Sequence, residues 1–276
     1  MSSGIGVLTE SQIGRIAYRP IQKILHFVRR RMHPELPIAH KWVRAEYRGR
    51  RLAIEVRRWV ASDSEAVDQC FRESQYEIPA GVHSAYIEGL YSKIVASGRK
   101  PLIVDCGANI GASVLWFRAR YPQAHIIAVE PAPDNFALLS RNCSLPDIDL
   151  WPAGIGAQDG TAWLSNPKAS KMAYRTNSAG DGVEIRIVSL ETLLKDKSIA
   201  ECVPFLLKVD IEGAERSLFT GDATLLDRFP LIVMEPHDWL LPGERTSVEF
   251  FRFHANAGRE FIMKHENVVS IAYGRD

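Results

Sequence analysis

The sequence lacks several features that would place it in a specialised class of protein. It contains no run of about 18 uninterrupted apolar residues, so no segment predicts a membrane-spanning helix. Its first twenty residues contain no apolar stretch of signal-peptide length. The four cysteines, at positions 70, 106, 143 and 202, have no CxxC spacing, which argues against a zinc site or a disulfide framework. We therefore expect a cytoplasmic protein with free thiols.

Length and charge suggest how the chain is organised. With 276 residues, 46% of them hydrophobic, it can bury one large α/β core with a smaller extension. The net charge of +1 hides an asymmetry, because residues 1–60 hold thirteen Lys or Arg against four Asp or Glu. This segment carries +9 and leaves −8 for the remainder. We predict a basic N-terminal extension of helix and strand over residues 1–65 and a second domain over 66–276.

The basic extension contains a candidate amphipathic helix over residues 20–32, which ends in three arginines. Such a helix favours peripheral contact with an anionic membrane. Docking on the acidic body, a cover over an active site and a homodimer interface remain open alternatives. Nucleic acid is not expected as a partner, because the body is acidic and contains no nucleic-acid-binding motif.

From residue 100 onward, predicted strands alternate with predicted helices, and the chain ends in a predicted hairpin over 259–274. This order indicates a doubly wound, mostly parallel sheet with one antiparallel strand near its end. Four predicted strands end on an acid, at Asp105, Glu130, Asp210 and Glu235. Ligands of such sheets bind at the carboxyl ends of the strands, so these acids are candidate site residues.

The turn "DCGANIG", residues 105–111, identifies the class of ligand. It lacks the central glycine of the GxGxxG dinucleotide fingerprint, and an acid precedes it, which disfavours a pyrophosphate and hence a nicotinamide cofactor. Asp105 instead favours an ammonium or sulfonium group, and Glu130 is placed to accept both hydroxyls of a ribose. A ribose with a cationic amino-acid tail is S-adenosylmethionine. The alternative is a tight turn in which Asp105 merely caps a helix.

Three motifs in order, "IVDCGANIGASVLWF", "VEPAPDNF" and "LLKVDIEGAERSLF", resemble the FkbM family of S-adenosylmethionine-dependent methyltransferases. The resemblance runs from about residue 68 to residue 237. It implies the seven-stranded, Rossmann-like class I methyltransferase fold and methyl transfer, usually to a hydroxyl oxygen. The expected acceptor is a sugar, a glycan or another small molecule. The alternative is a non-catalytic methyltransferase-fold interaction module.

The resemblance implies that the turn surrounds the methionine part of the cofactor, that Glu130 holds the ribose and that residues 153–155 line the adenine. The full set of expected cofactor-binding residues is Asp105, Gly107, Ala108, Asn109, Gly111, Ser113, Glu130, Pro131, Asn135, Ala153, Gly154, Ile155 and Asp210.

A hydroxyl acceptor needs help to lose its proton, so a base or a metal is required near the methyl group. The expected catalytic residues are His237, Asp210 and Glu235, with Glu212 and Asp238 as further candidates. His237 is the first choice for a base, because a histidine normally titrates near neutrality. A divalent ion on Asp210, Glu235 and His237 remains open, but no metal site is predicted because no ligand spacing fixes one.

Two further expectations concern neighbouring segments. Lys208, inside a predicted central strand, should be paired with an acid such as Glu235. The loop over 165–182, with Tyr174, Arg175 and Asn177, is expected to form a lid or acceptor wall, with a disordered insertion as the alternative.

Overall fold

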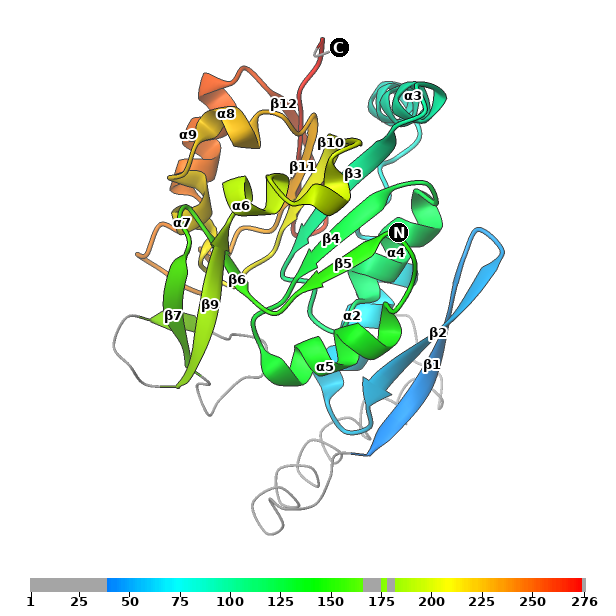
Figure 1. Cartoon of the computed structure of the whole chain (residues 1–276), viewed down its shortest axis with the longest axis vertical. Helices are drawn as coiled ribbons and strands as arrows, with labels where there is room; N and C mark the ends of the chain where they lie inside the picture. Colours follow the sequence, from blue (N-terminus) through cyan, green and yellow to red (C-terminus); the bar gives the residue numbers. More distant parts are fainter. Residues whose placement is uncertain (1–38, 166–174, 178–181, 275–276) are drawn as a thin grey trace, which may run out of the picture.

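A computed structural model describes residues 39–165, 175–177 and 182–274. Its centre is a seven-stranded sheet in the order β12-β13-β11-β10-β3-β4-β5 (Figure 1). The strands are β3 (Lys100–Cys106), β4 (His125–Val129), β5 (Ile148–Trp151), β10 (Cys202–Val209), β11 (Leu231–Met234), β12 (Glu260–Lys264) and β13 (Asn267–Ile271). Neighbours from β11 to β5 pair in parallel, whereas β13 runs antiparallel to both β11 and β12. The predicted doubly wound, mostly parallel sheet is confirmed.

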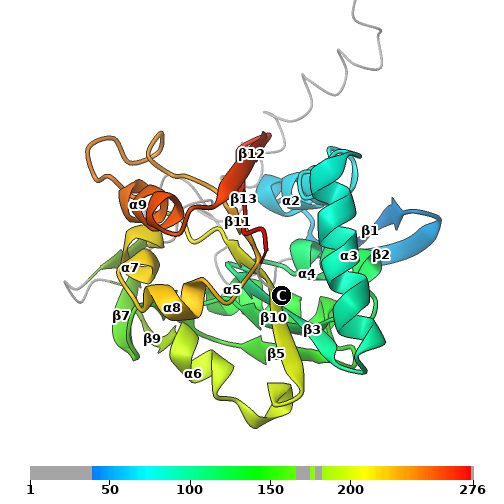
Figure 2. The same ribbon diagram turned by 90° about the horizontal axis from the view of Figure 1, so that it is seen from above.

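Helices cover both faces of this sheet (Figures 1 and 2). One face carries α2 (Ala61–Phe71), α3 (Val82–Ala96), α4 (Ala112–Arg120) and α5 (Pro133–Asn142). The other carries α6 (Leu190–Leu194), the 3-10 helix η1 (Lys197–Ile199), α7 (Glu215–Phe219), α8 (Ala223–Leu226) and α9 (Val248–Asn256). Along β3, Ile103 belongs to the first core, whereas Leu102 and Val104 belong to the second. Because successive strand residues face opposite sides, a continuous apolar run fits a strand buried on both faces.

A second, four-stranded sheet differs from the sequence-based expectation. The sequence of residues 148–155 predicts one strand, but the structure has two, β5 and β6 (Gly154–Gly156), separated at Pro152. β5 pairs with β4 of the large sheet, while β6 pairs with β9 (Val183–Ser189) of the small one. β7 (Gly160–Ser165) and β8 (Arg175–Asn177) complete the small sheet. Proline has no N–H to donate to a ladder, which accounts for the change of partner at this point.

A hairpin of β1 (His40–Tyr47) and β2 (Arg50–Arg57) packs beside α2, α4 and α5. Ile54 and Val56 are fully buried in the same core as α4, and the ring of Tyr47 lies edge-on to Trp116 with centroids 5.2 Å apart. Part of the predicted basic extension therefore shares its core with the rest of the chain. The boundary at residue 65 stays a prediction.

Two expected features fall outside the described residues. These are the basic helix over 20–32 and most of the loop over 165–182, including Tyr174. The four cysteines are buried and free, as expected. Within the described ranges, no helix is long and apolar enough to cross a membrane.

Candidate active site

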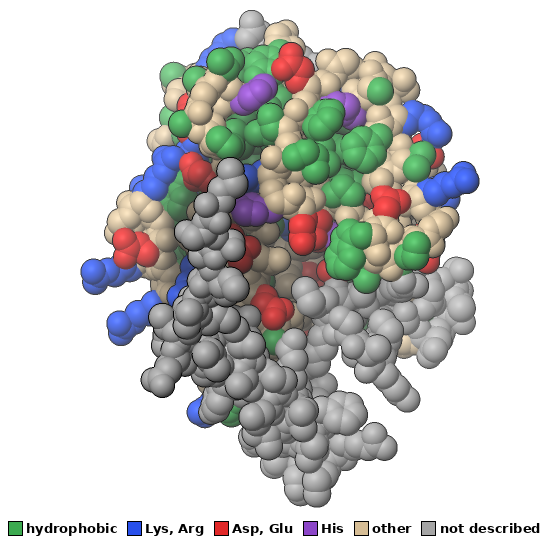
Figure 3. All heavy atoms as spheres, turned by 180° about the vertical axis from the view of Figure 1, so that it is seen from behind, with side chains coloured by type: hydrophobic (Ala, Val, Ile, Leu, Met, Phe, Trp, Pro, Cys, Tyr) green, Lys and Arg blue, Asp and Glu red, His purple; other side chains and the backbone are tan. Residues whose placement is uncertain are grey.

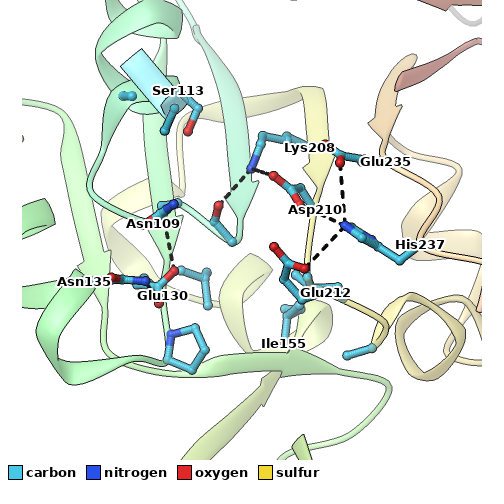
Figure 4. A pocket seen from close by; sticks show the side chains of 18 of the residues that line it. Asn109, Ser113, Glu130, Asn135, Ile155, Lys208, Asp210, Glu212, Glu235 and His237 are labelled. Atoms are coloured by element: carbon cyan, nitrogen blue, oxygen red, sulfur yellow. Dashed lines mark hydrogen bonds and ion pairs between the residues drawn. The ribbon is translucent and has the colours of Figure 1, made fainter. Parts of the chain in front are cut away.

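A cavity of about 440 Å³ lies at the carboxyl ends of β3, β4, β10 and β11. Most of the residues expected from the sequence line it. They are Gly107, Ala108, Asn109, Ser113, Glu130, Pro131, Asn135, Ala153, Gly154, Ile155, Asp210, Glu235 and His237. Figure 4 shows Glu130 and Asn135 on one side of this cavity and the group around His237 on the other.

The glycine turn between β3 and α4 closes tightly against the end of β10. Gly107 has a φ of 82°, and a Cβ added there would lie 1.8 Å from the backbone oxygen of Asp210. The Asp210 N–H donates to the carbonyl of Cys106 over 3.1 Å, which holds the two strand ends together. Only glycine fits this close approach with a left-handed backbone. At this turn the backbone after β3 therefore contacts the backbone at the end of β10 directly, with no side chain between them.

Glu130 lies at the end of β4 with both carboxylate oxygens inside the site. Oε2 accepts the N–H of Asn109 over 2.9 Å, and Oε1 accepts the N–H of Ala132 over 2.9 Å and the amide of Asn135 over 3.3 Å. Burial raises the pKa of Glu130 to about 7, although these hydrogen bonds act in the opposite direction. The carboxylate is held rigidly and faces the cavity.

Asp105 is placed differently from the sequence-based expectation, because it is fully buried and is not among the residues lining the cavity. Its Oδ2 accepts the hydroxyl of Ser113 over 2.6 Å, and its Oδ1 lies 3.0 Å from Nζ of Lys208. Lys208 also lies 3.5 Å from Asp210 and donates to the Gly107 carbonyl over 2.9 Å. Lys208 is therefore paired with acids, as predicted, but its partners are Asp105 and Asp210 and not Glu235, the acid named as an example.

Gly111 also lies outside the lining of the cavity. With a φ of 91°, it starts α4, and an added Cβ would lie 2.5 Å from Sγ of Cys143. The close neighbour of this glycine is the loop after α5, so its small size serves packing at the start of the helix.

His237 stands at the centre of a cluster of carboxylates. Its Nδ1 lies 2.7 Å from Oε1 of Glu215, which also accepts the N–H of Gly213 over 3.1 Å. Its Nε2 lies 3.7 Å from one carboxylate oxygen of each of Asp210, Glu212 and Glu235 (Figure 4). The histidine is 2% exposed. These contacts bring together all three predicted catalytic residues.

The cluster changes the proton affinity of its members. Burial and the neighbouring charge of Asp210 raise the pKa of Glu212 to about 7 and that of Glu235 to about 8. Burial lowers the pKa of His237, but the hydrogen bond to Glu215 and the surrounding carboxylates outweigh this and raise it to about 9. We expected the pKa of His237 to lie near neutrality. In the structure its neighbours raise this pKa, so they favour the protonated ring, the imidazolium.

Several site residues were not identified from the sequence. Arg57 of the hairpin donates to Asn135 over 2.8 Å and forms a bidentate pair with Asp63, so β2 supports the residues around Glu130. Glu215, the partner of His237, lies in the first turn of α7, where an acid is expected for reasons of helix stability alone. Trp239 lines the cavity and is 69% exposed. No local pattern marks these residues, because strand pairing and loop packing bring them to the site.

Comparison with known proteins identifies the family. A family model described as the methyltransferase FkbM domain matches residues 105–267, which is more than half of the chain. The chain belongs to the FkbM methyltransferase family. This match covers the glycine turn, the acids at the strand ends and the cluster around His237, and the chain is accordingly a methyltransferase with a Rossmann-like fold.

The chain is similar to several methyltransferases from other organisms. Methyltransferase sdnD from Sordaria araneosa is 32% identical over 184 residues, covering 54% of this chain and 70% of that protein. The hexuronic acid methyltransferase AglP from Haloferax volcanii is 24% identical over 147 residues, covering 52% and 59%. The crystal structure of methyltransferase FkbM from Methylobacillus flagellatus aligns with a TM-score of 0.45 at 16% identity, covering 63% and 44%. The matched regions thus span between 44% and 70% of the lengths of these three proteins.

Proposed function

We propose that this methyltransferase uses S-adenosylmethionine to methylate a hydroxyl group of a sugar, a glycan or another small molecule. The observation that carries the proposal is the pairing of two features across one cavity. Glu130 lies on one side with an acceptor carboxylate, and the Asp210, Glu235 and His237 cluster lies on the other. The first suits a ribose, and the second suits a group that must lose a proton.

The residues of the cavity fit the cofactor. The Gly107 turn presents backbone without a side chain to the cavity, because a Cβ would collide with Asp210. Oε1 of Glu130 already accepts two N–H groups, whereas Oε2 accepts only that of Asn109 and retains a lone pair for a ribose hydroxyl. We assign Glu130, Pro131 and Asn135 to the ribose, residues 153–155 to the adenine, and residues 107–109 with Asp210 to the methionine part. Asp105 acts behind this surface, where it pairs with Lys208 and accepts the hydroxyl of Ser113, which itself lines the cavity.

When bound, S-adenosylmethionine supplies a methyl group already activated by its sulfonium, so the chain has to align the acceptor, exclude water and manage one proton. We propose that the proton of the acceptor hydroxyl passes into the carboxylate–histidine cluster. The cluster consists of His237 with the carboxylates of Asp210, Glu212, Glu215 and Glu235. These carboxylates lie close together near the end of β10, where Asp210 lines the cavity. His237 can accept this proton at Nε2 only when its ring is neutral. The surrounding carboxylates oppose proton acceptance, because they raise the pKa of His237 and keep the ring protonated.

The proposed acceptor class draws on the relatives and on the rim of the cavity. One relative carries the name of a hexuronic acid methyltransferase, which supports a sugar as acceptor. Trp239, exposed beside the cavity, offers the flat apolar surface on which a sugar ring stacks. The proposed peripheral membrane contact through 20–32, the lid over 165–182 and a homodimer rest on the sequence alone.

Incubation with methyl-labelled S-adenosylmethionine and a panel of sugars, uronic acids and lipid-linked glycans tests the proposal. Carbon NMR of the product distinguishes an ether methyl from an ester or amine methyl. An O-methyl ether is expected. An ester would move the acceptor to a carboxylate, and cofactor binding without transfer to any class of acceptor would favour the non-catalytic interaction module.

A further inference from the structure

The carboxylate–histidine cluster contains more acidic ligands than one proton acceptor needs. Besides Asp210 and Glu235, it includes Glu212, whose side chain is 32% exposed and reaches toward the same point. Asp210, Glu212 and His237 each offer a ligand atom, and these atoms lie within 4.8 Å of one another. From behind the view of Figure 1, several acidic side chains gather near the middle of the face (Figure 3).

The second and independent observation is the orientation of His237. This ring is almost completely buried, and its Nδ1 is engaged by Glu215. Its Nε2 points toward the three other acids, yet among the described residues it has no hydrogen-bond partner, since each carboxylate oxygen is 3.7 Å away. A histidine that is held through Nδ1 and turns Nε2 toward three carboxylates beyond hydrogen-bond distance, at the wall of a cavity, has the arrangement of a metal ligand. The gap is too long for a hydrogen bond and has room for an ion.

From this geometry we infer that Asp210, Glu212, Glu235 and His237 form a binding site for a divalent first-row transition-metal ion. Ligand atoms about 2.1 Å from a shared ion are about 3.0 Å apart at right angles and about 4.2 Å apart when opposite. The separation of 3.7 Å between Nε2 and each oxygen lies between these limits.

The contact with Glu215 fits the same site. Histidine ligands of metals usually donate their other ring N–H to a carboxylate, which fixes the tautomer and strengthens the metal bond. Glu215 is fully buried and receives the N–H groups of Ile211 and Gly213 at 3.4 and 3.1 Å, so its position is set before any ion arrives. Glu215 is thus a positioning residue for His237.

The donor set indicates the class of ion. Three carboxylates suit Mg²⁺, Ca²⁺ and Mn²⁺, whereas an imidazole suits Zn²⁺, Fe²⁺ and their neighbours. Mn²⁺ accepts both kinds of ligand and is the ion we expect. Its role, to coordinate the acceptor oxygen and ease the loss of its proton, rests on the proposed function. The ion and a proton compete for Nε2, so proton acceptance then falls to the carboxylates.

The test is a titration of the full chain with Mn²⁺ alone, without cofactor or acceptor, followed by the electron paramagnetic resonance signal of the free ion. Wild-type protein should remove about one Mn²⁺ per chain from solution. His237→Gln should bind at least tenfold more weakly, on the scale of altered metal shells. His125→Gln is the matched control, because His125 also contacts a carboxylate, Asp149 at 2.7 Å, but in the first residue of β4. It should bind as wild type does.

Glu212→Gln gives a second variant whose folding is safer, because its side chain is partly exposed. It should also weaken binding at least tenfold, with an unchanged melting temperature in the absence of metal. A wild-type protein that leaves the free Mn²⁺ signal unchanged, or variants that bind as wild type does, would overturn the inference. Calorimetry with S-adenosylhomocysteine in the presence of a chelator separates the two proposals, because cofactor binding does not need the ion.

Discussion

The titration of Glu130 gives a quantitative prediction about cofactor binding. Burial raises the pKa of this carboxyl to about 7 in the ligand-free protein, against an ordinary value of 4.5. At pH 6 about a tenth of the molecules carry the carboxylate, and at pH 8 about nine tenths do. We propose that the carboxylate accepts the ribose hydroxyls, so the affinity for S-adenosylhomocysteine should rise about tenfold between these pH values, or about 1.4 kcal/mol.

Stability should change in the opposite direction. The folded protein binds the Glu130 proton more tightly than the unfolded chain does. Its contribution to the free energy of unfolding is therefore fully present below about pH 4.5 and is lost as the pH rises through about 7. The melting temperature of ligand-free wild type, compared with that of Glu130→Gln, should fall across this window while cofactor affinity rises.

Calorimetry from pH 6 to pH 8 on wild type and on Glu130→Gln measures the effect. The same ligand is used with both proteins, so its own protonation cancels in the comparison. The variant should bind more weakly throughout, because its NH₂ must face either Asn109 or Ala132, whose N–H groups now donate to the carboxylate. Parallel pH profiles for the two proteins would refute the assignment of Glu130 to the ribose.

Three further substitutions probe the support of the site. Lys208→Met leaves Asp105 buried without its cation, so the free energy of unfolding in urea should fall by about 3 to 5 kcal/mol, and adding Asp105→Asn should recover part of it. Gly107→Ala places a Cβ against β10 and should weaken cofactor binding at least tenfold in calorimetry; wild-type affinity would show that the turn yields. Arg57→Lys loses the fork that joins Asp63 to Asn135, so cofactor affinity should fall severalfold in the same assay, and no change would confine Arg57 to folding.

The segments that could be predicted from the sequence are those whose signals are local. The glycine turn follows a buried apolar strand, and the acids at strand ends mark the edge at which ligands bind, so the main sheet and most of the cavity lining were predictable. By contrast, the helix α9 was not identified, although its Phe250 and Phe253 are buried at helical spacing. The small sheet could not be predicted, because the pairing of β6 with β9 after Pro152 depends on the position of β9 in the folded chain.

The electrostatic partners were the least predictable part of the site. Lys208 pairs with Asp105 because the register of β10 on β3 places the two residues opposite each other. Glu215 reaches His237 across 22 residues of chain, and Arg57 reaches Asn135 across 78. Residues so far apart in the sequence produce no periodic pattern from which their contact could be predicted. Only the assembled strands and loops show why the proton affinity of His237 departs from its usual value.

Calorimetric binding of S-adenosylmethionine and S-adenosylhomocysteine to the purified chain, with NAD as the control, tests the central claim most directly. Both adenosyl compounds should bind and NAD should not, because the cavity contains the carboxylate of Glu130, which we assign to the ribose, and a glycine turn without the dinucleotide fingerprint. Binding of NAD, or no binding of either adenosyl compound, would contradict it.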